Sequence, residues 1–169
     1  MASRHGRQPF LCCERPALNL QDGVAERQVL QGPVVPFVSV TRLRVRSWRY
    51  LPAFLIRSLL AARQAGRAHG NLQVSVLRDA DRAFWTCTVW TDEAAMRSFM
   101  RAGAHRRVMP RLAKWCDEAA IAHWLQDKAE PPSWLEAHRR LQKKGRRSRV
   151  EHPSPAQQRF EFPPPSSVR

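Results

Sequence analysis

In residues 35–46, side chains of similar type recur at every second position, which is the period of a β-strand. One face of this predicted strand holds Phe37, Ser39, Thr41, Leu43 and Val45. The other face begins with valines and ends with arginines, in the order Val38, Val40, Arg42, Arg44 and Arg46. We expect the cationic end of the second face to leave the core.

A helical period replaces the strand period over residues 48–68. Its apolar stripe consists of Leu51, Phe54, Leu55, Ser58, Leu59 and Ala62. Pro52 fits this helix only because it lies in the first turn. Alternation returns over residues 71–77 and 84–90 with a polar loop between them, so a β-hairpin is expected after the helix.

A second helix follows the hairpin, with Thr91 as its predicted N-cap and two acidic residues in its first turn. Its apolar face carries Ala95, Met96, Phe99 and Met100. Gly103 is expected to interrupt this helix and Pro110 to break or kink it, leaving a shorter helix over residues 111–116. A fourth strand is predicted over residues 119–124.

The element order β-α-β-β-α-β predicts an α+β fold of the ferredoxin-like type, with both helices on one face of an antiparallel sheet. Nothing in this order covers the opposite face, where Val38 and Val40 lie. An uncovered apolar face favours association. We therefore expect a homodimer that forms through the open face of the sheet.

The chain continues past the predicted domain into a short helix, Trp134 to Leu141, with Gly145 as its C-cap. Beyond Gly145 the prolines favour an extended arm, anchored by Val150, Phe160 and Phe162. Four segments result: a disordered N-terminal extension (1–34), a ferredoxin-like domain (35–127), a C-terminal helix and arm (128–162) and a disordered tail (163–169).

The formal net charge of +15 is divided unevenly, with +1 before residue 34, +9 over residues 34–141 and +5 after them. The last part contains the basic cluster of residues 143–149. Arg146, Arg147 and Arg149 are therefore candidates for nucleic-acid binding. However, the sequence has no zinc-finger spacing, aromatic RNA-binding signature or helix-turn-helix, so a nucleic-acid partner is the weaker alternative.

The four cysteines include no C-x-x-C pair, so neither a metal site nor a disulfide scaffold is predicted. Cys87 and Cys116 fit buried, reduced thiols, and a reducing cytoplasm is the compartment this favours. The apolar stretch Leu51–Ile56 is far shorter than the roughly 20 residues of a membrane span. No signal peptide and no membrane partner are expected.

Three stretches, residues 37–43, 86–96 and 103–109, together resemble the antibiotic-biosynthesis-monooxygenase-like dimeric α+β barrel superfamily. The arm over residues 145–155 extends the resemblance to the uncharacterised, DUF3291-like members of that superfamily. In all, the resemblance covers residues 35–162. It implies a dimeric α+β barrel, with activities in the superfamily that range from quinone-forming monooxygenases to haem-degrading enzymes and carotenoid oxygenases.

The sequence departs from the haem-degrading branch, which resembles it in fold but needs an Asn on the first strand and a Trp and a His on the second helix. The matching positions hold Thr41, Phe99 and Met109. Quinone-forming members that need no cofactor orient a phenol with Trp, Asn or His side chains, and only Trp and His occur here. The resemblance therefore assigns no cofactor, and haem stays open.

His105 is the candidate catalytic residue, because its place on the second helix is similar to that of a histidine often seen in the superfamily. A neutral imidazole near pH 7 can act as a general base or ligate haem iron. A histidine that only caps a helix end is the alternative. The candidate substrate-binding residues are Thr41, Trp90, Phe99, Trp85 and His123. On a regular strand, Trp85 and Trp90 lie on opposite faces.

The resemblance, together with these candidate residues, implies a monooxygenase-like domain that binds or oxidises an apolar aromatic or polyene metabolite between the sheet and the helices. A dimeric module that binds a ligand or a partner without catalysis is the alternative, and whether the chain is an enzyme stays open at this point.

Overall fold

Five strands form one antiparallel sheet in the computed structural model, which describes residues 35–166. The strands are β1 (Phe37–Val45), β2 (Asn71–Arg78), β3 (Ala83–Trp90), β4 (Cys116–Leu125) and β5 (Arg146–Arg147), in the spatial order β2-β3-β1-β4-β5. The first four have the order and pairing of the ferredoxin-like α+β fold, as predicted. The predicted extension over residues 1–34 lies outside the described residues.

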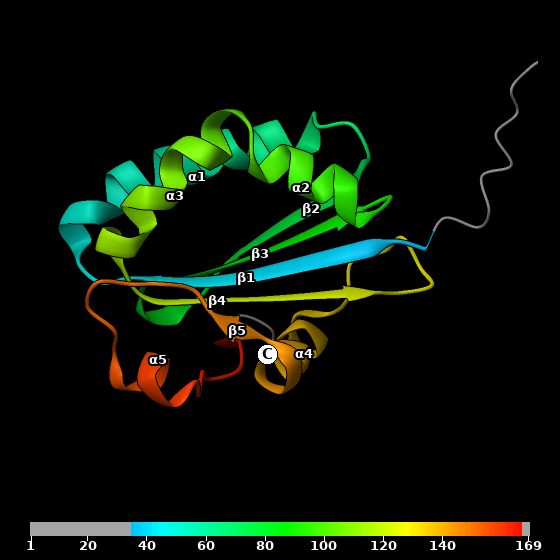
Figure 1. Ribbon diagram of the computed structural model, residues 1–169. Helices are drawn as coiled ribbons and strands as arrows, with labels where there is room; N and C mark the ends of the chain where they lie inside the picture. The colour runs from blue at the N-terminus through cyan, green and yellow to red at the C-terminus, as the bar shows by residue number, and fades with distance from the viewer. Residues whose placement is uncertain (1–34, 167–169) are drawn as a thin grey trace, which may run out of the picture. The chain divides into compact units, whose positions relative to one another are not determined.

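Three helices cover one face of the sheet, α1 (Leu51–Gly66), α2 (Glu93–Met100) and α3 (Gly103–Trp115) (Figure 1). Pro52 lies in the first turn of α1, as expected. By contrast, Pro110 does not end α3, so the predicted break is wrong. Val108 and Leu112 pack against the core on either side of Pro110, and this packing offsets the loss of one backbone hydrogen bond.

The N-cap of α2 is Asp92 rather than Thr91. The Asp92 carboxylate accepts a hydrogen bond from the backbone N–H of Ala95 at 2.8 Å, whereas the Thr91 hydroxyl donates to Asp92. A carboxylate at this position accepts an otherwise unpaired amide and carries a full charge against the helix dipole. The prediction was wrong by one residue.

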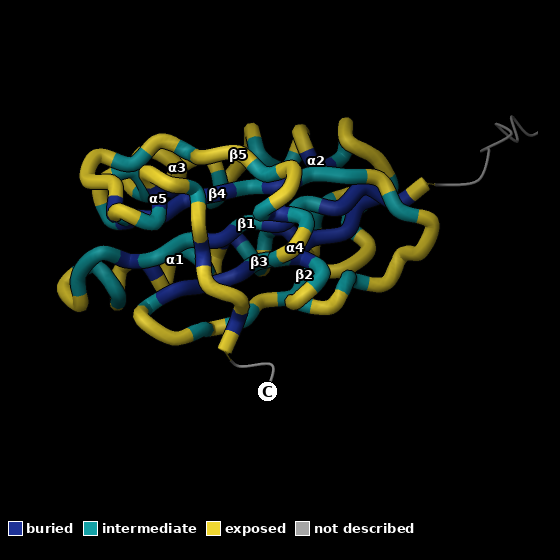
Figure 2. Tube along the Cα trace, turned by 90° about the horizontal axis from the view of Figure 1, so that it is seen from below, coloured by how far each residue is buried: buried dark blue, intermediate teal, exposed yellow. Residues whose placement is uncertain are grey.

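The opposite face of the sheet is covered by the C-terminal part of the chain, so the expectation of an open face is wrong. Helices α4 (Trp134–Lys144) and α5 (Pro155–Arg159) lie against this face (Figure 1). Val38 and Val40 are fully buried there together with Leu141 and Phe162. Figure 2, seen from this side, shows the central strands as buried beneath the C-terminal segment. The uncovered surface that predicted a homodimer therefore does not exist in residues 35–166.

The cationic end of β1 leaves the core only in part, because Arg42 stays inside the molecule, contrary to expectation, while the Arg44 side chain is 25% exposed. Arg42 is buried and forms an ion pair with buried Glu118 on β4. Arg44 donates two hydrogen bonds of 2.9 Å to Asp117, and Ser154 donates to Glu118 at 2.8 Å. The arginines are thus neutralised by acidic residues of the neighbouring strand, which the pattern of β1 alone did not reveal.

The arm is joined to the sheet by β5, which pairs with Ala120 and Ile121 of β4. The Gln157 side chain accepts from the backbone N–H of Ala119 and donates to its carbonyl oxygen, both at 3.0 Å. Phe162 is buried, as predicted for an anchor, and Val150 and Phe160 pack against the core. The short helix α5 is an addition to the extended arm that was expected.

The predicted tail over residues 163–169 is described only as far as Ser166. The backbone N–H of Ser166 donates to the Asp79 carboxylate at 3.0 Å and its hydroxyl donates at 2.6 Å, so residues 163–166 lie against the domain. Cys87 and Cys116 are buried free thiols, as predicted, and burial raises the pKa of each to about 12. No described helix has the length and apolar character needed to cross a membrane.

Candidate functional site

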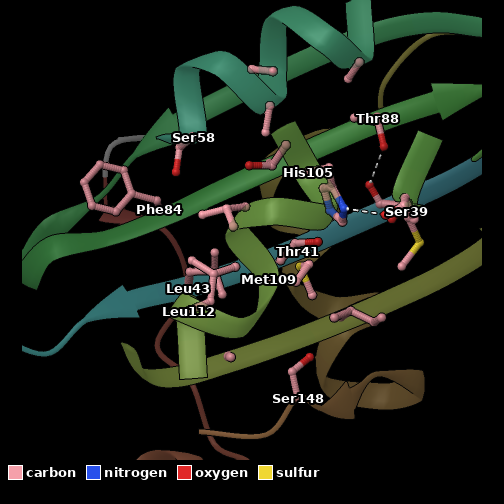
Figure 3. Close-up of a pocket in the computed structure, with 18 of the residues that line it drawn as sticks. Ser39, Thr41, Leu43, Ser58, Phe84, Thr88, His105, Met109, Leu112 and Ser148 are labelled. Atoms are coloured by element: carbon pink, nitrogen blue, oxygen red, sulfur yellow. Dashed lines mark hydrogen bonds between the residues drawn. The ribbon is translucent and has the colours of Figure 1, made fainter. Parts of the chain in front are cut away.

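A large cavity of about 930 Å³ lies between the sheet and the three helices α1, α2 and α3 (Figure 3). Its floor is the face of the sheet that carries Ser39, Thr41 and Leu43, and its roof is built from the helices. The volume is in the range of cavities that hold small-molecule ligands. The sheet therefore has one face packed against its own chain and one face that encloses space.

The strand register arranges the floor of the cavity in three rows that run across four strands. The first row is Val74, Thr88, Ser39 and His123. The second row is Val76, Thr86, Thr41 and Ile121. The third row is Arg78, Phe84, Leu43 and Ala119. Hydroxyl groups occupy the middle of the first two rows, whereas Phe84 and Leu43 make the middle of the third row apolar.

Three of the four hydroxyl groups on the central strands are available to a ligand. Thr88 accepts a hydrogen bond from the indole N–H of Trp90 at 2.8 Å and donates to the carbonyl of Ser39 at 3.4 Å. The side chains of Ser39, Thr41 and Thr86 have no hydrogen-bond partner within residues 35–166. A hydroxyl group that faces a cavity without a protein partner can bind a polar atom of a ligand.

The roof of the cavity is predominantly apolar. Its large side chains are Phe54, Leu55 and Leu59 from α1, Met96, Phe99 and Met100 from α2, and Val108, Met109 and Leu112 from α3. Methionine side chains adapt to ligands of irregular shape, and apolar walls favour ligands with little charge.

His105 reaches the cavity from the first turn of α3, where the chain reverses after α2. Gly103 begins α3 with φ +54°, and a Cβ atom at that position would lie 2.6 Å from the Oε1 atom of Gln64. Gln64 of α1 accepts from the backbone N–H of His105 at 3.1 Å and donates to the carbonyl oxygen of Ala102 at 3.1 Å. Glycine is therefore required at this turn, and Gln64 fixes the turn to α1.

The contacts of the His105 ring determine its tautomer. Its Nδ1 atom lies 3.2 Å from the carbonyl oxygen of Met100, and because a carbonyl only accepts hydrogen bonds, Nδ1 carries the proton. No described residue is a hydrogen-bond partner of Nε2, so its lone pair is available. The ring also packs against Phe99 with a centroid distance of 4.7 Å. Figure 3 shows the ring between α3 and the sheet.

Burial lowers the pKa of His105 below its ordinary value of 6.5, and the hydrogen bond to Met100 opposes this effect only in part. The ring is therefore neutral at pH 7. A neutral imidazole with a free Nε2 is a hydrogen-bond acceptor and a general base.

His123 lies beside Ser39 in the first row of the floor, at the edge formed by β4. Its ring contacts Phe37 with a centroid distance of 5.5 Å. Burial lowers the pKa of His123, and the charge of Arg146 lowers it further. His123 is thus a second neutral imidazole that lines the same cavity.

The structure brings together four of the six predicted site residues. Thr41, Phe99, His105 and His123 line the cavity. Trp90 lies behind it, fully buried and stacked on Phe99 with a centroid distance of 5.2 Å, so it supports the wall without forming it.

Trp85 cannot contact a ligand in this cavity, which corrects its place among the candidate binding residues. It lies on the covered face of the sheet, where its indole N–H donates to Asp79 at 3.2 Å. The two tryptophans are on opposite faces, as the strand period predicted.

The predicted basic cluster is divided between different roles. Arg147 donates to the carbonyl oxygens of Gln157 and Gln158 at 2.9 and 2.7 Å, so it holds α5 against β5. Arg149 is exposed and lines the cavity, whereas Arg146 is exposed on β5. Because one of the three arginines is engaged within the chain, the cluster offers fewer cations to nucleic acid than the sequence suggested.

The donor groups do not fit a bare metal ion, because residues 35–166 contain no cluster of three or more His, Cys, Asp or Glu side chains that could hold one. Haem needs only one axial ligand from the protein, and Nε2 of His105 is a nitrogen of the required kind. Haem iron held by His105 would supply oxygen chemistry.

Sequence reasoning missed two residues that position the site. Gly103 had been recognised only as an interruption of a helix, although its position two residues before His105 indicates a tight turn beneath the candidate base. Gln64 gave no signal, because a half-buried glutamine on a helix has no distinctive spacing. Its role depends on contacts 35 to 41 residues away in the chain.

Comparison with known proteins supports this architecture. An antibiotic biosynthesis monooxygenase proposed in Nitrosomonas europaea matches with a TM-score of 0.50 and 15% identity, over 62% of this chain and all of that one. A conserved protein from Methanosarcina mazei matches with a TM-score of 0.50 and 14% identity, over 56% of this chain and 95% of that one. These identities show the fold alone. No curated protein sequence matches the chain.

A family model places the chain more directly. The model describes a domain of unknown function, DUF3291, and matches residues 52–167, which include α4 and the arm as well as most of the sheet. This confirms the resemblance to DUF3291-like proteins, and the solved structures confirm the fold that the resemblance implied. The chain belongs to the family described as domain of unknown function DUF3291.

Proposed function

We propose that the cavity binds an apolar aromatic or polyene metabolite and that His105 acts on this ligand as a general base in an oxygenase-type reaction. The observation that carries the proposal is the neutral imidazole of His105, which lines an apolar cavity of about 930 Å³ with its Nε2 atom unpartnered in the described residues. Polar chemistry is confined to a few groups in a cavity of this kind, which is typical of ligand sites.

The roof, the floor hydroxyl groups and His105 have different roles in this proposal. The apolar roof binds the body of the ligand, and the hydroxyl groups of Thr41 and Thr86 orient its polar atom. Nε2 of His105 accepts a proton from an acidic O–H or C–H group of the ligand, which leaves an electron-rich anion. Reaction of such an anion with molecular oxygen is the chemistry that the monooxygenase resemblance implies.

Binding without catalysis is the second candidate, and one observation favours it. His105 already has two structural contacts, the hydrogen bond to Met100 and the packing against Phe99. A histidine can be retained for these contacts alone, in which case the cavity stores or carries its ligand.

Titration with 2-naphthol, an apolar aromatic ligand with one acidic hydroxyl group, tests the proposal and separates the two candidates. We expect saturable binding, detected by tryptophan fluorescence, and oxygen uptake by the complex. His105→Gln should retain binding within a few-fold and slow oxygen uptake by about 10²- to 10⁴-fold. Binding without oxygen uptake by the unaltered protein would favour the second candidate, and a lack of saturable binding by any apolar aromatic probe would contradict both.

A further inference from the structure

Helix α1 presents large apolar side chains to the outside of the molecule. Leu55, Ile56, Leu59 and Leu60 are between 42% and 61% exposed. Positions i, i+1, i+4 and i+5 lie on one side of a helix, so the four side chains form a continuous strip. The side of α1 that packs into the core carries Phe54, Ala61 and Ala65 instead. Helix α1 therefore has an apolar side in the core and a second apolar side in solvent.

The charged residues of the chain segment that contains this strip are all cationic. Residues 35–78 contain eight arginines and no Asp or Glu. Arg63 and Arg67 follow Leu60 at helical spacing on the same side of α1, and both are exposed. Neither forms an ion pair within residues 35–166. The strip thus combines apolar side chains with uncompensated positive charge.

The residues before α1 also combine an exposed apolar side chain with an exposed cation. Trp48 is 64% exposed, and exposed Arg49 lies beside it in the 3₁₀ turn η1 (Trp48–Tyr50) that leads into α1. Tryptophan and arginine are favoured where a protein meets the boundary between lipid and water, because each has an apolar body and a polar end.

A second copy of the chain is a poor occupant of this surface. Helix α1 has no acidic residue that could pair with Arg63 and Arg67 of a second α1 packed against it. Four partly exposed side chains also offer far less than the roughly 800 Å² per partner that a stable interface buries.

We propose that the outer side of α1 is a docking surface for an anionic lipid bilayer. Leu55, Ile56, Leu59 and Leu60 enter the boundary between headgroups and acyl chains, and Arg63 and Arg67 bind lipid phosphates. This surface differs in kind from a membrane span, which residues 35–166 do not contain. It shares Leu55 and Leu59 with the roof of the cavity but includes neither His105 nor the hydroxyl groups of the floor.

The exposed strip on α1 adjoins the cavity. Leu55 and Leu59 belong both to the exposed strip and to the lining of the cavity. A bilayer bound to α1 would therefore lie against the edge of the cavity. If the proposed function holds, and on that condition alone, an apolar ligand can pass between the bilayer and the cavity without crossing water.

Co-sedimentation of the full chain with ligand-free vesicles tests the docking independently of the proposed function. Vesicles of phosphatidylcholine alone are compared with vesicles of equal parts phosphatidylcholine and phosphatidylglycerol. We expect binding to the anionic vesicles that weakens as salt is added. The double variants Ile56→Ser/Leu60→Ser and Arg63→Gln/Arg67→Gln should each lower the partition constant by about tenfold or more. None of these four residues lines the cavity.

Matched controls lie on the opposite layer of the molecule. Leu135→Ser removes an exposed leucine of α4, and Lys143→Gln/Lys144→Gln removes two exposed cations of the same helix. Both controls should bind vesicles as the unaltered chain does. Equal loss of binding in the controls, or equal binding to both kinds of vesicle, would overturn the proposal.

Two further outcomes would reassign the surface. If the α1 variants change the sedimentation coefficient without affecting vesicle binding, the surface is an interface between copies of the chain. If duplex DNA retains the chain through Arg63 and Arg67 while vesicles do not, it is a nucleic-acid surface. Either result contradicts docking to lipid, whereas quenching of Trp48 fluorescence by brominated phosphatidylglycerol, lost in Trp48→Phe, would support it.

Discussion

The two faces of strand β1 show how one sheet serves two purposes. Val38 and Val40 point to the face that α4 and the arm cover, and both are fully buried. Ser39 and Thr41, their neighbours in the chain, point to the cavity. The covered face carries one continuous core, whereas the other face has two smaller buried clusters, around Trp90 and around Phe54, with the cavity beside them. Space for a ligand is therefore confined to one face of these strands, and side chains that face this space can be changed separately from those packed in the core.

The largest expected effect is on the covered face, where Glu118→Ala would leave Arg42 buried without its partner. Removing one member of a buried ion pair costs about 3–5 kcal/mol of unfolding free energy. Glu161→Ala is the control, because Glu161 pairs with Arg159 at the surface and should cost less than about 1 kcal/mol. Urea denaturation measures both, and equal costs would show that the Arg42–Glu118 pair is not essential to this face.

A second comparison uses one leucine from each side of the sheet. Leu141→Ala should cost about 2–5 kcal/mol, because Leu141 is fully buried in the core of the covered face. Leu59→Ala should change stability by no more than about 0.5 kcal/mol, since Leu59 lies at the open edge of the cavity. Thermal unfolding of the two variants measures the contrast. A large cost for Leu59→Ala would mean that the cavity edge also carries stability.

The hydroxyl groups on the cavity floor provide a finer test. Thr88→Val leaves the buried indole N–H of Trp90 without its acceptor and should cost about 1–3 kcal/mol. Thr41→Val and Thr86→Val remove hydroxyl groups that have no partner in residues 35–166, so stability should stay within about 0.5 kcal/mol. These two variants should instead weaken ligand affinity by about two- to tenfold. Calorimetry of unfolding and of ligand binding distinguishes the two patterns.

The smallest expected effect is a dependence of stability on pH that originates in the cavity. Burial lowers the pKa values of His105 and His123 below the ordinary value of 6.5. As the pH falls below 6.5 the unfolded chain takes up protons first, so stability decreases until the folded-state pKa values are passed. Each unit of lowering is worth about 1.4 kcal/mol. His105→Gln/His123→Gln should flatten this part of the profile, and an unchanged profile would contradict neutral histidines.

Much of the fold followed from the sequence because its elements are locally encoded. Strand alternation over residues 35–46 and the helical stripe that contains Phe54 gave the element order, and that order gave the sheet topology. The family resemblance led us to expect a pocket between the sheet and the helices, and Thr41 and His105 both line it. Local periodicity also placed Trp85 and Trp90 on opposite faces.

The predictions that were wrong concern contacts between residues that lie far apart in the sequence. The sequence around Arg42 predicts a solvent-exposed strand end, because its ion-pair partner Glu118 lies 76 residues later in the chain. The apolar face of β1 suggested a partner molecule, because the burial of Phe162 against that face could not be deduced from a proline-rich segment. The Gln157 side chain forms hydrogen bonds with the backbone of Ala119 in place of a neighbouring strand. No sequence pattern indicates this role.

The difference between the two faces of the sheet is tested most directly by adding the same side chain to each face and measuring both thermal unfolding and 2-naphthol binding. Ala62→Phe adds a ring to the cavity from α1, and Ala137→Phe adds one to the packed core beneath α4. We expect the unfolding free energy of Ala62→Phe to stay within about 0.5 kcal/mol of that of the unaltered chain while binding is lost, whereas Ala137→Phe should lose about 1–3 kcal/mol or more. Equal destabilisation by the two substitutions, or undiminished binding in Ala62→Phe, would contradict this difference between the faces.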